Sequence, residues 1–137
     1  MRKTILLSLL VTVLATESCK KDSTTTPIIN TTVQQSTWKI TLLSLNGVDQ
    51  TSHYTDYQFT YTSSGSVTAT KTGSTVTGTW SSGFDDSKEK LILMFSANPF
   101  LELNEDWEVV SQSSTFVSLR HISGGGGGTD LLNFTKI

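Results

Sequence analysis

The chain has 137 residues, of which 36% are hydrophobic, and this is enough for one domain with a modest core. Its formal net charge is −2 at pH 7, and no long run of basic residues interrupts this balance. Nucleic-acid binding is therefore excluded, because a phosphate backbone needs a clustered positive surface.

The first eighteen residues have the three-part layout of a secretory signal peptide. A basic start over residues 1–3 precedes an uncharged apolar run over residues 5–15. That run is too short to cross a bilayer as a helix. Small polar residues then lead to Cys19, the only cysteine in the chain. The layout predicts export, with residues 1–18 removed.

A lone cysteine in an exported chain has no second thiol for a disulfide. The position of Cys19 directly after the apolar run resembles the lipobox of bacterial lipoproteins. Ser18 suits the residue before the cleavage point, whereas Thr16 and Glu17 depart from the usual motif. The resemblance implies a thioether-linked diacylglycerol on Cys19, a further acyl chain such as palmitate, and attachment to the outer membrane. A secreted protein with an unmodified thiol is the alternative.

The segment after Cys19 is polar and rich in Thr and Ser, with one proline and no apolar period. We expect residues 19–36 to be a flexible tether. Its start, Lys20-Lys21-Asp22, resembles tethers of Bacteroidetes lipoproteins, some of which are carried to the cell surface.

From residue 37 to the end of the chain, apolar and polar residues alternate, and the outer positions are rich in threonine. This period of two is typical of half-buried antiparallel strands, and no apolar segment there keeps a helical period for three turns. The pattern predicts eight strands, near residues 37–45, 56–62, 66–71, 75–81, 89–96, 105–110, 115–122 and 130–136.

The links between these strands are short, and several contain the Gly and Ser residues of tight turns. Because none is clearly long enough for a Greek-key return, strands that are neighbours in sequence are expected to pair. An all-β, eight-stranded antiparallel up-and-down barrel over residues 37–137 satisfies this rule and leaves no free sheet edge. An open or sandwiched sheet is the alternative.

Four stretches fall in the order typical of a known domain family: "STWKITLLSLNG", "TGTWSS", "DWEVVSQSSTFVSL" and "LLNFTKI". Over residues 36–137 they resemble the lipocalin-like domain of Bacteroidetes lipoproteins. The resemblance implies a lipocalin-like barrel in which Trp38 is the tryptophan of the first strand. It also implies a structural stack of Trp38 with a basic residue late in the chain, either Arg120 or Lys136. Ser36 stands where lipocalins have a glycine.

Large rings dominate the inward-facing positions of the predicted strands. So many rings in a short barrel favour a mostly packed core, with at most a shallow cup at one mouth. If the cup exists, Gly78 leaves room for a small apolar or amphipathic ligand. The side chains expected to contact that ligand are Tyr57, Tyr61, Trp80 and Trp107. The full inward set is Trp38, Tyr57, Phe59, Tyr61, Trp80, Phe95, Trp107 and Phe134.

The stretch "KLILMF" departs from the alternation, because its outer positions are apolar too. Either a loop covers this strand or it exposes a surface for a protein or glycan partner. The partner surface would contain Ile92, Met94 and Phe100.

No arrangement of residues in the sequence points to catalysis. The two histidines, His53 and His121, are far apart in sequence, and the paired carboxylates at residues 85–86 and 105–106 fall in turns. We therefore expect no enzyme activity, no cofactor and no metal site. Two functions stay open: a membrane-anchored module that binds a small apolar or amphipathic ligand, and an accessory surface lipoprotein that binds a protein or glycan.

Overall fold

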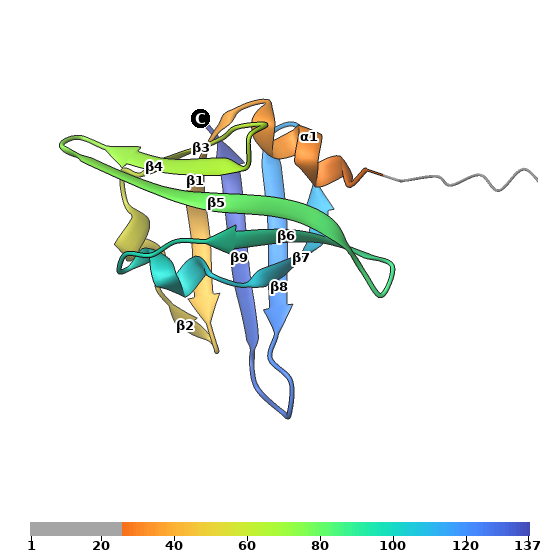
Figure 1. Ribbon diagram of the computed structural model, residues 1–137. Helices are drawn as coiled ribbons and strands as arrows, with labels where there is room; N and C mark the ends of the chain where they lie inside the picture. The colour runs from red at the N-terminus through yellow and green to blue at the C-terminus, as the bar shows by residue number, and fades with distance from the viewer. Residues whose placement is uncertain (1–25) are drawn as a thin grey trace, which may run out of the picture.

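The computed structural model describes residues 26–137, so the signal peptide, Cys19 and the first residues of the expected tether lie outside the described residues. The elements, in chain order, are α1 (Ile28–Gln34), β1 (Thr37–Leu45), β2 (Val48–Asp49), η1 (Thr51–Tyr54), β3 (Gln58–Tyr61), β4 (Ser66–Lys71), β5 (Ser74–Asp85), β6 (Lys88–Met94), η2 (Phe100–Leu103), β7 (Asp106–Gln112), β8 (Phe116–Ile122) and β9 (Thr129–Lys136) (Figure 1). Among the described residues, no helix has the length and apolar character needed to cross a membrane.

The strands form one closed antiparallel barrel. Strands β1, β3, β4, β5, β6, β7, β8 and β9 pair in this order, and β1 also pairs with β9. The β1–β9 ladder runs from Trp38 opposite Lys136 to Ser44 opposite Leu131, which closes the sheet. The short strand β2 pairs only with the end of β1. The prediction of an eight-stranded up-and-down barrel is confirmed.

The β5–β6 hairpin is longer than the sequence pattern predicts. The expected loop after residue 81 is part of the ladder, which continues to the pair Asp85–Lys88. Asp86 and Ser87 form the two-residue turn, both with positive φ. Such a turn matches the twist of the flanking strands, so the hairpin extends almost to its tip.

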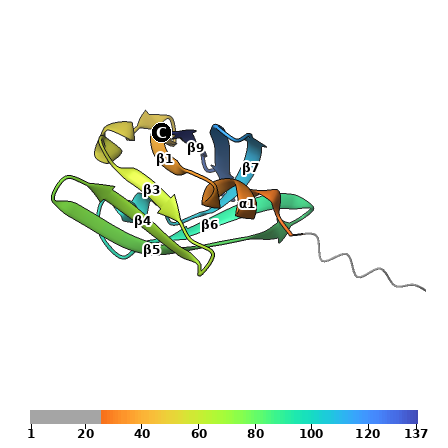
Figure 2. The ribbon, with the colours of Figure 1, turned by 90° about the horizontal axis from the view of Figure 1, so that it is seen from above.

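Helix α1 contradicts the prediction that residues 19–36 are all flexible tether, because residues 28–34 are helical. Ile29 and Val33 lie four residues apart, so both face the barrel, and both are fully buried. The backbone carbonyl of Val33 accepts a hydrogen bond from the indole Nε1 of Trp38 at 2.9 Å. Figures 1 and 2 show α1 lying across one end of the barrel, where it contacts β1, β3, β5, β6 and β7. The folded part of the chain therefore begins near residue 27, not at residue 37.

The two short 3-10 helices extend the core on the side of the barrel away from α1 (Figure 1). Tyr54 of η1 and Phe100 of η2 are buried, and their ring centroids are 5.4 Å apart in an edge-to-face arrangement. The Tyr54 hydroxyl donates to the carbonyl of Pro99 at 3.0 Å. These contacts join the link that precedes β3 to the link that precedes β7.

All eight rings expected to face inward are buried. The expected stack of Trp38 with Arg120 or Lys136 is not formed. Arg120 is hydrogen-bonded to Glu108, and the cation that lies over a ring among the described residues is Lys71, 4.4 Å from the ring centroid of Tyr57. The complete hydrophobic core comprises Ile29, Val33, Trp38, Ile40, Leu43, Tyr54, Tyr57, Phe59, Tyr61, Val67, Ala69, Trp80, Leu91, Leu93, Phe95, Phe100, Leu103, Trp107, Val117, Leu119, Leu132 and Phe134.

Candidate functional site

The space expected beside Gly78 is occupied by Phe95. A Cβ atom built on Gly78 would lie 2.6 Å from Cδ1 of Phe95 and 2.5 Å from the carbonyl oxygen of Met94. Contacts this short mean that the absent side chain makes room for the Phe95 ring. Gly78 thus serves close packing of β5 against the end of β6 and the Phe95 ring.

All four aromatic residues expected to contact a ligand are buried in the core. Tyr61 and Trp80 touch edge to face, with centroids 5.7 Å apart, and the Trp80 indole N–H donates to the carbonyl of Thr62. Trp107 is fully buried, and its indole N–H donates to Leu103 at 2.9 Å.

The Tyr61 hydroxyl is buried without a hydrogen-bond partner among the described residues. Burial raises the pKa of this phenol well above its ordinary value, because the charged form would lose its solvation. The hydroxyl therefore stays protonated throughout the physiological pH range.

Tyr57 lies at the margin of the core, beside an open groove on the barrel wall. Strands β1 and β3 are paired only at Thr37–Thr60 and Trp38–Phe59. Beyond this point β1 follows β9, with a bulge between Ile40 and Leu42, and it separates from the segment that leads into β3. The gap leaves a recess between the two strands.

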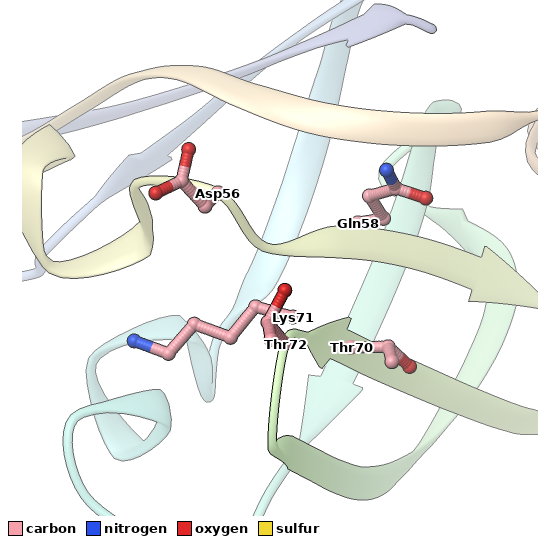
Figure 3. Close-up of a pocket in the computed structure, with 5 residues that line it drawn as sticks. All are labelled: Asp56, Gln58, Thr70, Lys71 and Thr72. Atoms are coloured by element: carbon pink, nitrogen blue, oxygen red, sulfur yellow. The ribbon is translucent and has the colours of Figure 1, made fainter.

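We call this recess, together with the adjoining hollow over the ends of β3 and β4, the seam groove. The part between β1 and β3 has a volume of about 480 Å³, and the part over β3 and β4 has about 510 Å³. Figure 3 shows the second part, with two side chains from the β3 side and three from the end of β4. The groove is lined by Lys39, Ile40, Tyr54, Thr55, Asp56, Tyr57, Gln58, Thr70, Lys71, Thr72 and Ile137.

The seam groove has a mostly polar lining with an aromatic margin. Gln58 and Thr70 are directly opposite in the β3–β4 ladder, so their side chains share one face. Asp56 adopts a positive φ of 68°, and Figure 3 shows its carboxylate on the same side as the Gln58 amide. The ammonium of Lys71 lies over the ring of Tyr57. An acid, an amide and hydroxyls thus line the groove, together with Lys71, whose ammonium lies over Tyr57.

The expected partner surface is only partly exposed. The side chain of Met94 is 56% exposed and Ile92 is half-buried, but Phe100 is 1% exposed and belongs to the core. The prediction that Phe100 belongs to an exposed partner surface was therefore wrong. It packs edge to face on Tyr57, with centroids 5.0 Å apart, because η2 folds back over the rings of β3. Leu101, the next residue, is 44% exposed instead.

Each histidine lies beside carboxylates that are distant in sequence. Nδ1 of His53 is 2.9 Å from a carboxylate oxygen of Glu102, and this contact joins η1 to η2. The two ring nitrogens of His121 face Glu105 and Asp106. The sequence did not predict this second grouping, because the β7–β8 register alone brings residues 105–106 to His121.

The fold and the site define a small closed barrel with a filled interior, a covering helix and a polar groove along one seam. One similar solved structure is a DUF4847 family protein from Bacteroides vulgatus, with a TM-score of 0.54 and 15% sequence identity. The match covers 78% of this chain and 96% of that chain. At this identity the similarity concerns the fold alone. No protein-family model matches this chain. No curated protein matches it either.

Proposed function

We propose that this protein is an exported, membrane-anchored, non-catalytic binding module of lipocalin-like type, and that its seam groove binds a hydroxyl-rich polar ligand such as a glycan. One observation carries the proposal. The barrel interior is filled by aromatic rings, whereas the outer wall holds an open groove with a polar lining. A few convergent polar groups in a concave surface are what orient a bound small molecule.

The chemistry of the lining favours a glycan over an apolar ligand. Hydroxyls of Thr70 and Thr72 donate and accept, the carboxylate of Asp56 accepts, and the amide of Gln58 does both. Sugar hydroxyls need such mixed partners. Asp56 is the one acidic side chain among the lining residues. Because glycoside hydrolysis generally uses two carboxyl groups, we propose binding without cleavage.

The proposed anchor at Cys19 would keep the folded domain close to a membrane. Helix α1 begins at Ile28, nine residues after Cys19. A fully extended chain spans at most about 3.3–3.6 Å per residue, so the start of α1 would lie within roughly 30 Å of the lipid-bearing residue. Such a module would hold its ligand at the membrane surface.

The proposal is tested by titrating the purified protein with soluble oligosaccharide fragments and following backbone amide signals by NMR. We expect saturable shifts at residues 56–58 and 70–72, reduced at least tenfold in apparent affinity by Gln58→Ala together with Thr70→Ala. Asp56→Asn should also weaken binding. Asp86→Asn is the matched control, because Asp86 is likewise a positive-φ aspartate but sits at the β5–β6 turn.

Two alternative functions predict other results: binding of an apolar ligand inside the barrel, and binding of a protein partner on the outer surface. A co-purifying lipid in native mass spectrometry, with shifts at Tyr61 and Trp80, would replace the glycan proposal with a ligand inside the barrel. Shifts confined to Met94 and Leu101 on addition of a membrane extract would favour a protein partner on that face.

A further inference from the structure

Three side chains converge where β7 begins and β8 ends. Nδ1 of His121 lies 3.1 Å from Oδ1 of Asp106, and Nε2 lies 3.5 Å from Oε2 of Glu105. Within residues 26–137, this is the one group of three His, Cys, Asp or Glu residues whose donor atoms all lie within 4.8 Å of one another. The imidazole is thus held between two carboxylates, one on each ring nitrogen.

The surroundings of His121 carry an excess of negative charge. Asp130 is its direct partner in the β8–β9 ladder and is buried, and its Oδ1 accepts the backbone N–H of Asn46 at 2.7 Å. Lys90 supplies one opposing charge, with Nζ 3.6 Å from Oδ2 of Asp106. Three carboxylates against one ammonium attract a further cation.

We propose that Nε2 of His121 and the carboxylate of Glu105 bind a divalent transition-metal ion such as Zn²⁺. In the tautomer that donates from Nδ1 to Asp106, Nε2 carries the lone pair that faces Glu105. Metal-bound histidines commonly make this second hydrogen bond to a carboxylate, which fixes the ring orientation. Asp106 is therefore a positioning residue.

The separation of the two ligand atoms suits a bound ion. Two ligands at about 2.1 Å from a tetrahedral zinc are roughly 3.4 Å apart, and Nε2 and Oε2 are 3.5 Å apart. The His121 ring packs edge to face against Trp107, with centroids 6.4 Å apart, so its position is fixed. The Glu105 side chain is 41% exposed and free to adjust. Water would fill the two remaining positions of a four-coordinate ion on the open side, one more than in zinc sites with three protein ligands.

The test is calorimetric titration of the purified full chain with Zn²⁺, in a Cys19→Ser background so that no thiol contributes. We expect one saturable site. His121→Asn should abolish it, Glu105→Gln should weaken it more than tenfold, and Asp106→Asn should weaken it by roughly tenfold. Lys90→Gln should tighten binding, because it removes the competing ammonium.

The matched control is His53→Asn, which removes the other histidine paired with a carboxylate and should leave the Zn²⁺ affinity unchanged. A second readout uses Ni²⁺, which should quench the emission of the adjacent Trp107 and lose this effect in His121→Asn. Circular dichroism verifies that each variant keeps the barrel. Absence of a saturable site, or equal losses in the two histidine variants, would overturn the proposal and leave an ordinary ion-paired surface.

Discussion

Glu89, on strand β6, accepts a hydrogen bond from the backbone N–H of Ile29 at the start of helix α1, sixty residues earlier in the chain. The other carboxylate oxygen of Glu89 accepts from the amide of Gln112 on β7 at 2.8 Å. One half-buried carboxylate thus ties the helix to two neighbouring strands. Because the N–H groups at a helix start have no partner within the helix, this contact fixes where α1 begins.

Glu89→Ala should loosen α1 from the end of the barrel. Hydrogen bonds to a charged group contribute about 1.5–3 kcal/mol, so the free energy of unfolding should fall by about this amount. Hydrogen exchange of the α1 amides should accelerate beyond that of the strands, and mass spectrometry measures this directly. Glu105→Ala, which removes a carboxylate that does not touch α1, is the control. Equal protection of α1 in both variants would show that apolar packing alone holds the helix.

Gly78→Ala should destabilise the barrel, whereas Gly83→Ala on the same strand should not. The new methyl group at position 78 would collide with the Met94 carbonyl and the Phe95 ring, but at position 83 nothing lies within 4 Å. Overpacking of this kind costs about 1–3 kcal/mol. Urea denaturation of the two variants measures the difference, and equal midpoints would contradict the packing role of Gly78.

The strands and the rings that they turn inward were predictable because both follow from alternation. Every second residue of a half-buried strand faces inward, so the rings of Tyr57, Phe59 and Tyr61 could be assigned without coordinates. The order of pairing followed from the short links, since strands joined by tight turns pair with their neighbours. Closure through the β1–β9 ladder was favoured over an open sheet because it removes the free edges.

Helix α1 and the seam groove were not predictable in the same way. Only Ile29 and Val33 mark the inner face of the helix, and two apolar residues in a polar stretch are too few to define a period. The groove depends on the point where β1 leaves β3 for β9, which no local pattern encodes. The pairing of His121 with Asp106 depends likewise on the register of two strands.

Trp107→Ala should cost about 3–5 kcal/mol of stability, because it removes a fully buried ring and leaves a cavity. That is a large share of the 5–15 kcal/mol typical of a folded domain. Trp80→Ala should also be destabilising, since Trp80 is only 7% exposed. Acrylamide quenching of native emission tests the burial before any substitution. Strong quenching would indicate that the rings line a solvated mouth.

The Glu108 ion pairs should make stability depend on pH in the acid range. Hydrogen bonds from Arg120 at 2.7 Å and from Lys88 hold the pKa of Glu108 below its ordinary value of 4.5. A carboxyl group whose pKa is lower in the folded state stabilises the fold above its unfolded pKa. This contribution is lost as the pH falls through the lowered folded value.

Glu108→Gln should therefore flatten the loss of stability below pH 4.5, as measured by urea midpoints across the acid range. Arg120→Gln should have a similar effect, because it removes the main cause of the lowered pKa. The double variant should lose no less stability with falling pH than either single variant, because both substitutions remove the same ion pair. If Glu108→Gln loses stability below pH 4.5 as steeply as the wild type, Glu108 is not the cause of the acid sensitivity.

Cys19→Ser should release the protein from the membrane fraction. The prediction rests on the sequence, since Cys19 lies outside the described residues and follows the apolar run of the signal. A single acyl chain gives only marginal membrane binding, so stable attachment needs the several chains that lipoprotein processing adds. Labelled palmitate should enter the wild type and not the variant. Ser18→Ala keeps a small residue before the cleavage point, so this control should stay lipidated. A variant that remains in the membrane, together with an unlabelled wild type, would show that attachment does not depend on Cys19.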